Sequence, residues 1–180
     1  ASGYEGITAA SYTASSTQYH KYEGTQSVST WPLSYETLAY STSAANTQSI
    51  MSLSKSTSND DYGFLYFNGP TGGDPFSADL KGPSGNTSSA STSTGYSTST
   101  WYAVAMTRSG TTTGTTTVYK DGGSSGTSGT TLVATAFDGF SIGAVMLNAG
   151  IFSKLDGRVA FAAISNSAQT ANFIATQNQN

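Results

Sequence analysis

The chain has 180 residues, of which only 9% are charged, and its formal net charge is −3. Its seven Lys and Arg residues are scattered, so no basic cluster points to nucleic acid or an anionic membrane as a partner. The absence of cysteine excludes disulfides, cysteine-bound metals and a thiol nucleophile. No run of 18 apolar residues predicts a membrane span, and we expect no membrane insertion.

The polar surface is built mainly from hydroxyl groups. Ser and Thr make up roughly a third of the chain, as suits Thr-rich strand surfaces. Eleven Tyr, eight Phe and two Trp supply the apolar mass that a disordered chain lacks. The composition therefore indicates one all-β domain over residues 1–180, with residues 1–8 as a lead-in.

The first strands follow from apolar alternation. Residues 9–22 predict the opening strands, and residues 28–40 predict a strand that Pro32 ends or places at an edge, because proline cannot donate to a ladder. Ile50, Met51 and Leu53 predict the next strand. A turn at residues 59–61 precedes residues 62–67, the most apolar strand of the chain.

The middle of the chain is harder to assign. Residues 68–74 predict a loop and residues 76–81 a short strand. Residues 82–100 contain almost only Ser, Thr and Gly. Two interpretations compete for them, a flexible loop, which composition favours, and hydroxyl-rich strands at a sheet edge.

Residues 100–122 predict a hairpin. Tyr102, Val104 and Met106 alternate onto one face of its first strand, and the residues between them, also apolar, onto the other. A strand that is apolar on both faces lies inside a sandwich or barrel. The loop covers residues 109–114, the return strand residues 115–120, and Asp121 and Gly122 supply a tight turn.

The last third predicts a loop at residues 122–129, strands at 132–137, 140–143 and 155–161, and a helix within 165–177. Asn166 and Ser167 are the candidates for the N-cap of this helix.

Five motifs occur in a fixed order along the chain. They are W-x-x-V-A-x-T-R from Trp101, V-Y-x-D-G from Val118, Ile142-Gly143, F-x-x-x-D-G-R from Phe152 and Ala168-Gln169-Thr170. This combination resembles the laminin-G-like, concanavalin A-like jelly roll over residues 9–176. The resemblance implies two packed antiparallel sheets with paired chain ends. It also implies a domain that binds glycans or proteins, serves as a virion or cell-surface module, or in some branches cleaves polysaccharides.

On this basis we expect an antiparallel β-sandwich with a short C-terminal helix. The side chains expected to form its core come from four predicted strands: Tyr102, Val104, Met106, Phe64, Tyr66, Ile142 and Phe161.

The sequence argues against an enzyme. Glycosidases need two carboxylates placed close together, whereas Glu5, Glu23 and Glu36 are isolated and no E-x-D-x-E run occurs. A Ser-His-Asp triad would need His20, the sole histidine, and no G-x-S-x-G motif accompanies it. We expect His20 to be structural.

Calcium is the one cofactor that the resemblance admits, because loops at the rim of laminin-G-like domains often hold it. Hard cations take oxygen ligands, and the candidates are Asp60, Asp61, Asp74, Asp121 and Asp138, with Asp121 best explained as a turn residue. Turn formation is the alternative explanation for each of the others.

Glycan binding needs an exposed aromatic ring and polar donors, and Tyr22, Trp31 and Tyr96 could supply the ring. The composition favours another function, that of a non-catalytic surface or structural module such as a virion decoration or fibre-type protein. It would contact copies of itself or other proteins through residues 1–8 or 82–100, because low charge reduces self-repulsion. A lectin or adhesion module that binds cell-surface glycans is the alternative. Either function predicts a location on a virion surface or outside the cell.

Overall fold

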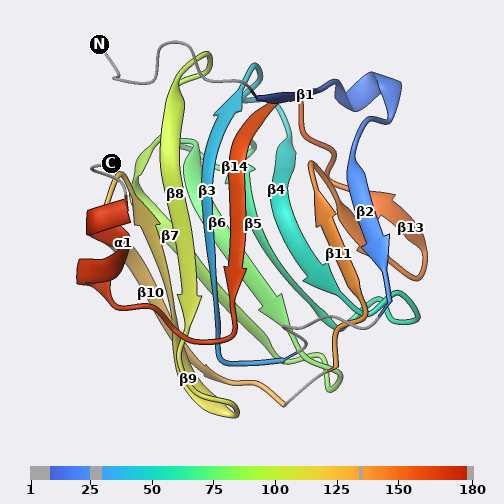
Figure 1. Ribbon diagram of the computed structural model, residues 1–180, viewed down its shortest axis with the longest axis vertical. Helices are drawn as coiled ribbons and strands as arrows, with labels where there is room; N and C mark the ends of the chain where they lie inside the picture. Colours follow the sequence, from blue (N-terminus) through green and yellow to red (C-terminus); the bar gives the residue numbers. More distant parts are fainter. Residues whose placement is uncertain (1–8, 25–29, 134–135, 178–180) are drawn as a thin grey trace.

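The computed structural model describes residues 9–24, 30–133 and 136–177 and shows two antiparallel sheets packed face to face. Figure 1 shows the two layers, with the short helix α1 (Ala171–Gln177) beside the sandwich. The all-β jelly-roll prediction is confirmed. No helix in these ranges is long and apolar enough to cross a membrane.

One sheet, here the β3 sheet, has the strand order β1-β14-β3-β8-β9-β10. Its strands are β1 (Ala10–Tyr12), β14 (Gly157–Ser165), β3 (Leu33–Ser41), β8 (Trp101–Arg108), β9 (Thr113–Lys120) and β10 (Gly123–Thr131). β1 pairs with β14, so the predicted pairing of the two ends of the chain is confirmed. β3 begins directly after Pro32, as its missing amide hydrogen predicts.

The other sheet, here the β4 sheet, has the order β2-β11-β4-β5-β6-β7. Its strands are β2 (His20–Glu23), β11 (Gly139–Ile142), β4 (Thr47–Ser54), β5 (Tyr62–Asn68), β6 (Pro75–Lys81) and β7 (Thr87–Gly95). A small hairpin, β12 (Val145–Leu147) and β13 (Gly150–Phe152), forms a third, two-stranded sheet. The 3-10 helix η1 (Ala14–Ser16) lies between β1 and β2 in the chain.

The main core lies between the inner faces of the two sheets, which are the faces turned toward each other. Tyr102, Val104 and Met106 belong to it, as predicted, and Ile142 packs against it. Phe64 and Tyr66 are buried too, but in a separate cluster with Val145 on the outer face of the β4 sheet.

Phe161 was wrongly predicted to lie in the core, since half of its side chain is exposed. A β-bulge in β14 between Val159 and Phe161 explains the error. Val159 points into the core, the extra residue Ala160 shifts the alternation, and Phe161 therefore points outward.

Three further predictions need correction. Residues 122–129 were predicted to form a loop, but most of them belong to β10. The strand predicted at 132–137 is wrong over its described part, because β11 begins only at Gly139. The helix begins at Ala171, and its first turn is capped by Thr170, whose Oγ1 accepts from the Phe173 amide at 3.2 Å, and not by Asn166 or Ser167.

For residues 82–100, the alternative of a hydroxyl-rich edge strand is confirmed, because β7 forms the edge of the β4 sheet there. The lead-in at residues 1–8, which includes Glu5, and the start of the predicted third strand at Val28 lie outside the described residues.

Candidate functional site

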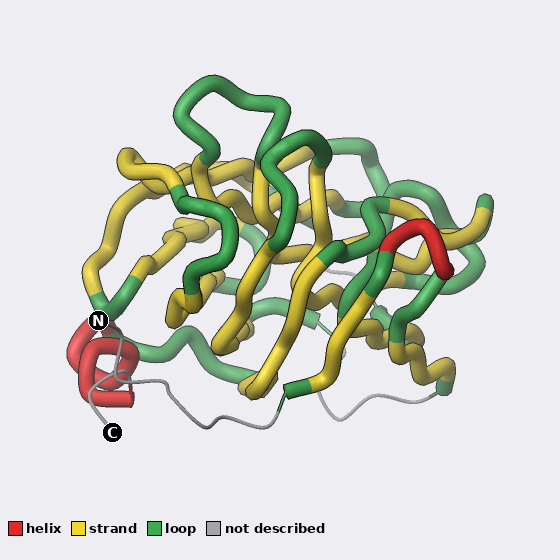
Figure 2. Tube along the Cα trace, turned by 90° about the horizontal axis from the view of Figure 1, so that it is seen from above, coloured by secondary structure: helices red, strands yellow, loops and turns green. Residues whose placement is uncertain are grey.

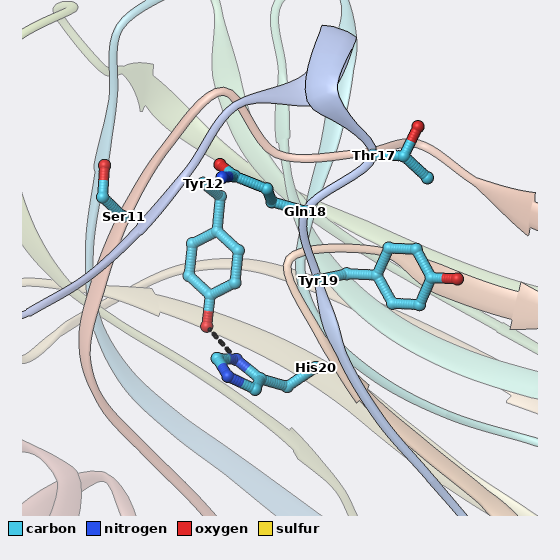
Figure 3. A pocket seen from close by; sticks show the side chains of 6 residues that line it. All are labelled: Ser11, Tyr12, Thr17, Gln18, Tyr19 and His20. Atoms are coloured by element: carbon cyan, nitrogen blue, oxygen red, sulfur yellow. Dashed lines mark hydrogen bonds between the residues drawn. The ribbon is translucent and has the colours of Figure 1, made fainter.

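A pocket of about 300 Å³ opens where β1 of one sheet comes close to β2 of the other. Figure 3 shows its lining, which comes entirely from the segment that carries the chain between the two sheets. The lining residues are Ser11, Tyr12, Thr17, Gln18, Tyr19 and His20. They offer two phenol rings, an imidazole, an amide and two aliphatic hydroxyl groups.

Local hydrogen bonds shape this segment. Thr17 adopts a left-handed conformation with φ 57° that ends η1, and its amide donates to the Ala14 carbonyl oxygen. Gln18 reaches back, and its Oε1 accepts from the Thr13 amide at 2.9 Å. The turn between β1 and β2 is therefore closed by its own residues.

Tyr12 and His20 form the wall of the pocket. The Tyr12 hydroxyl lies 2.9 Å from Nδ1 of His20, and the two rings meet edge to face with centroids 5.7 Å apart. Tyr12 is almost fully buried, and this burial raises the pKa of its hydroxyl. The arrangement fits the structural role expected for His20.

Gly143 makes room for the Tyr12 ring. A Cβ at Gly143 would lie 2.7 Å from Cδ1 of Tyr12, and the φ of 79° at this residue also favours glycine. The Ile142-Gly143 motif of the sequence therefore has a direct role in the pocket, since it allows Tyr12 to seat against β11.

Tyr22 lies two residues beyond His20 on β2, so the two side chains alternate onto the same face of the strand. Of the three aromatic residues predicted to bind a ligand, Tyr22 is the one that is exposed, at 55%. On the opposite face of β2, Lys21 and Glu23 form an exposed ion pair at 2.9 Å.

The other two aromatic predictions lack the exposure that they require. Trp31 is 1% exposed and packs edge to face on Phe137. Tyr96 is 6% exposed, contacts the Phe67 and Phe76 rings, and donates to the Ser43 carbonyl oxygen. Both rings are used to fill the core, so neither can stack on a sugar.

The predicted calcium ligands do not come together. The described residues contain no group of three His, Cys, Asp or Glu side chains able to hold a metal ion. Asp60 pairs with Lys81, and Asp138 accepts from the Ser56 amide at 2.6 Å. Asp61 is buried, and Asp74 and Asp121 hold turns at positive φ, the turn role predicted for Asp121.

Sequence reasoning did not identify the pocket, although it placed Tyr12, Tyr19 and His20 on opening strands. The tyrosine density of residues 12–22 was the available signal. The missing information was that β1 and β2 belong to different sheets, which turns the segment between them into a wall at the edge of the sandwich.

Comparison with solved structures shows the same fold in several proteins. The chain superposes on the Ruminococcus gnavus IT-sialidase CBM40 bound to α2,3-sialyllactose with a TM-score of 0.71 and 13% identity, over 96% of each chain. A heptameric SAP-like pentraxin from Limulus polyphemus gives 0.63 and 19% identity, over 89% of this chain and 81% of that one.

The receptor-binding domain of botulinum neurotoxin type G gives a TM-score of 0.63 and 11% identity, with 97% of this chain and 46% of that chain covered. No curated protein matches the chain. Residues 11–175 match the family model described as the concanavalin A-like lectin/glucanases superfamily. The chain therefore belongs to the concanavalin A-like lectin/glucanase superfamily.

Proposed function

We propose that this protein is a non-catalytic glycan-binding module and that the pocket between β1 and β2, extended by Tyr22, receives the sugar. The pocket carries this proposal, because it combines aromatic rings with neutral hydrogen-bonding groups in about 300 Å³. This volume lies at the lower end of small-molecule sites, which suits one or two sugar rings.

The side chains match the chemistry of a sugar. A pyranose has an apolar C–H face that packs on an aromatic ring, and the exposed ring of Tyr22 is available for this contact. The rim of the ring offers hydroxyl groups, which pair with the Gln18 amide nitrogen and with the Ser11 and Thr17 hydroxyls.

A positively charged group also lies next to the pocket. Lys154 donates from Nζ to Thr17 Oγ1 at 3.3 Å. An acidic sugar could use this charge, whereas a neutral sugar could not. Among the similar folds, the Ruminococcus gnavus module was solved with sialyllactose, so sialyllactose and lactose form the natural test pair.

Binding without cleavage is part of the proposal. The six residues that line the pocket include no carboxylate, and hydrolysis of a glycosidic bond by the common mechanisms uses two. Glu23, the nearest glutamate in sequence, is paired with Lys21 on the opposite face of β2 from His20 and Tyr22.

Titration of the protein with sialyllactose and lactose, followed by NMR or calorimetry, tests the proposal. Tyr22→Ala and Tyr19→Ala should each weaken binding about fivefold, equivalent to about 1 kcal/mol. Phe173→Ala is the matched control, because this exposed aromatic lies on α1 at the other end of the sandwich (Figure 2). Lys154→Ala should weaken the binding of sialyllactose and leave that of lactose unchanged.

Three results would contradict parts of the proposal. A glycan array without any binding would reject the function, whereas binding that is equally strong in Tyr22→Ala, Tyr19→Ala and the wild type would reject this site. Release of reducing ends from a polysaccharide panel, abolished by replacing one carboxylate, would reject the non-catalytic assignment.

A structural role as a virion decoration or fibre-type protein is the second candidate. Low charge and a hydroxyl-rich surface support it, as does the apolar outer face of the β3 sheet, described below. This role predicts that the protein co-purifies with particles in fixed stoichiometry. Under either function we expect it on a virion surface or outside the cell.

A further inference from the structure

The outer face of the β3 sheet, which points away from the β4 sheet, carries three cross-strand rows of side chains. The strand register places Arg158, Tyr40 and Trp101 side by side in the first row. The second row contains Phe161, Leu38 and Ala103, and the third contains Ala163, Glu36 and Ala105. These nine residues are called the outer patch below.

The outer patch is apolar over most of its area. Phe161 is 50% exposed, and Tyr40, Leu38, Trp101 and Ala163 are partly exposed. Helix α1 covers the patch only at its far end, where Ile174 packs on Ala105 and Tyr119. Large exposed apolar side chains that adjoin on one face mark a surface for interaction.

The bulge in β14 creates this patch. If Ala160 were paired as a regular residue of the strand, strict alternation would place Phe161 on the same face as the core residue Val159. The bulge instead turns the largest apolar side chain of β14 outward, next to Leu38. Bulges are local features that re-aim side chains, which points to a use for an exposed Phe161.

Two opposite charges flank the centre of the patch. The Arg158 guanidinium lies over the Tyr40 ring, 5.5 Å from its centroid, and makes no salt bridge within the described residues. Glu36 makes neither a salt bridge nor a side-chain hydrogen bond within the same residues. Partial burial in these apolar surroundings raises the pKa of its carboxyl group.

The positions of these charges are compatible with a two-fold arrangement of two copies. Arg158 lies on β14 one row to one side of the Phe161–Leu38 pair, and Glu36 lies on β3 one row to the other side. A two-fold axis in the plane of a face-to-face contact, passing between Phe161 and Leu38 and perpendicular to the line from Arg158 to Glu36, exchanges the two positions. Each Arg158 then faces a Glu36 across the contact.

We propose that the outer patch binds the same patch of a second copy, forming a symmetric dimer with Phe161 and Leu38 at its centre. Two-fold contacts require a surface that is complementary to itself, and this surface carries one unpaired charge of each sign at exchangeable positions. Sheets pack face to face through apolar outer rows in the same way as within a sandwich. The inference is independent of the proposed glycan binding.

A charge-swap series measured by light scattering or analytical ultracentrifugation tests the dimer. The wild type should have twice the chain mass of 18.5 kDa at high micromolar concentration, and Phe161→Lys should be monomeric. Glu36→Arg and Arg158→Glu should each be monomeric alone, because like charges then face each other across the contact. An equimolar mixture of these two variants should recover the dimer, since every facing pair is again opposite in charge.

Glu23→Arg, which alters an exposed charge on β2 outside the patch, is the control and should remain dimeric. Circular dichroism identifies variants that fail to fold. A monomeric wild type would overturn the proposal, as would a dimer that survives Phe161→Lys or a mixture that stays monomeric. If Phe161→Lys abolishes glycan binding and leaves the mass unchanged, the patch is a glycan platform and the dimer is rejected.

Discussion

The Tyr12 hydroxyl and the His20 ring, 2.9 Å apart, join the edge strands of two different sheets. β1 is the last strand of the β3 sheet and β2 the last strand of the β4 sheet, so this contact bridges one open edge of the sandwich. At the opposite edge, the Ser88 and Thr116 hydroxyls lie 2.9 Å apart between β7 and β9, and both are buried. One edge is therefore bridged by a tyrosine–histidine contact in which His20 is exposed, and the other by two buried hydroxyl groups. The contribution of each bridge to stability depends on whether water can replace it.

A tyrosine hydroxyl should contribute more where water cannot replace it. Tyr35 Oη donates to the Gly63 carbonyl oxygen at 2.9 Å and accepts from the Leu53 amide at 3.0 Å, and it links the two sheets through the core. Tyr35→Phe leaves both backbone groups without this partner and should lower the free energy of unfolding by about 1–3 kcal/mol.

Tyr12→Phe is the matched control, since the exposed His20 can bond to water instead. It should cost less than about 1 kcal/mol in urea unfolding. Equal losses for the two variants would show that the Tyr35 bridge contributes nothing beyond an ordinary surface hydrogen bond.

Much of the fold was predictable because alternation and turn chemistry act locally. The hairpin of β8 and β9 is the clearest case. Its first strand, β8, is apolar on both faces, and Asp121 and Gly122, which join β9 to β10, adopt φ values of 49° and 83°, as a tight two-residue turn requires. Asp121 also accepts from the Ala103 amide at 3.1 Å, which fixes the turn against β8.

Composition missed β10 and did not decide between a loop and an edge strand for β7, because Gly, Ser and Thr occur here where the two sheets approach closely. β10 lies against β7 so closely that a Cβ at Gly126 would be 1.8 Å from the Ser91 carbonyl oxygen. Along the inner face of β7 the residues are Ser88, Ala90 and Thr92, all small and all buried. Glycine and hydroxyl residues usually indicate loops, but here they allow two backbones to approach.

At the candidate site, the sequence could not predict which aromatic side chains are exposed. Tyr22, Trp31 and Tyr96 look alike in sequence, and only the packing of the two sheets separates the exposed ring from the two buried ones. Phe161 shows the reverse case, since a one-residue bulge exposes a side chain that alternation assigns to the core.

The close approach of β10 to β7 gives a prediction with a control on the same strand. Gly126→Ala places a methyl group on the Ser91 carbonyl oxygen, and we expect a loss of about 1–3 kcal/mol. Gly129→Ala has open space around its added Cβ and should be neutral or slightly stabilising. Thermal unfolding of the two variants measures the difference, and equal melting temperatures would contradict the close contact.

Arg108 organises the end of the β8–β9 hairpin and is fully buried. Its guanidinium donates to the carbonyl oxygens of Gly114, Thr112 and Thr130 at 2.7, 3.1 and 2.6 Å, and desolvation lowers its pKa. Arg108→Met keeps most of the volume but removes three charge-assisted hydrogen bonds, although the Thr112 carbonyl oxygen still accepts from the Leu132 amide, so we expect the free energy of unfolding to fall by about 3 kcal/mol or more.

Arg158→Met removes an exposed arginine of the same sheet and is the comparison for Arg108→Met. In urea unfolding, at a protein concentration too low for dimers, Arg158→Met should change the free energy of unfolding by no more than about 0.5 kcal/mol. A loss at Arg108 as small as that at Arg158 would mean that the three carbonyl groups find other donors.

Glu36 gives a prediction about pH. Desolvation raises the pKa of this carboxyl group above its ordinary value of 4.5, so the folded monomer holds a proton more tightly than the unfolded chain. The resulting stabilisation is fully present below pH 4.5 and is lost as the pH rises through the pKa of the folded state. At pH 7 the ionised carboxylate therefore destabilises the monomer.

In dilute solution Glu36→Gln should melt at a higher temperature than the wild type at pH 7, and the difference should shrink as the pH falls toward 4.5. Glu23→Gln, which removes a carboxylate already paired with Lys21, should give no such gain. At high protein concentration the sign should reverse, because in the dimer Glu36 faces Arg158 of the second copy and the neutral amide loses that ion pair. If the melting temperature of Glu36→Gln at pH 7 stays above that of the wild type at every protein concentration, Glu36 has no partner in a second copy and the dimer is contradicted. If the melting temperature does not rise in dilute solution, water already solvates this carboxylate.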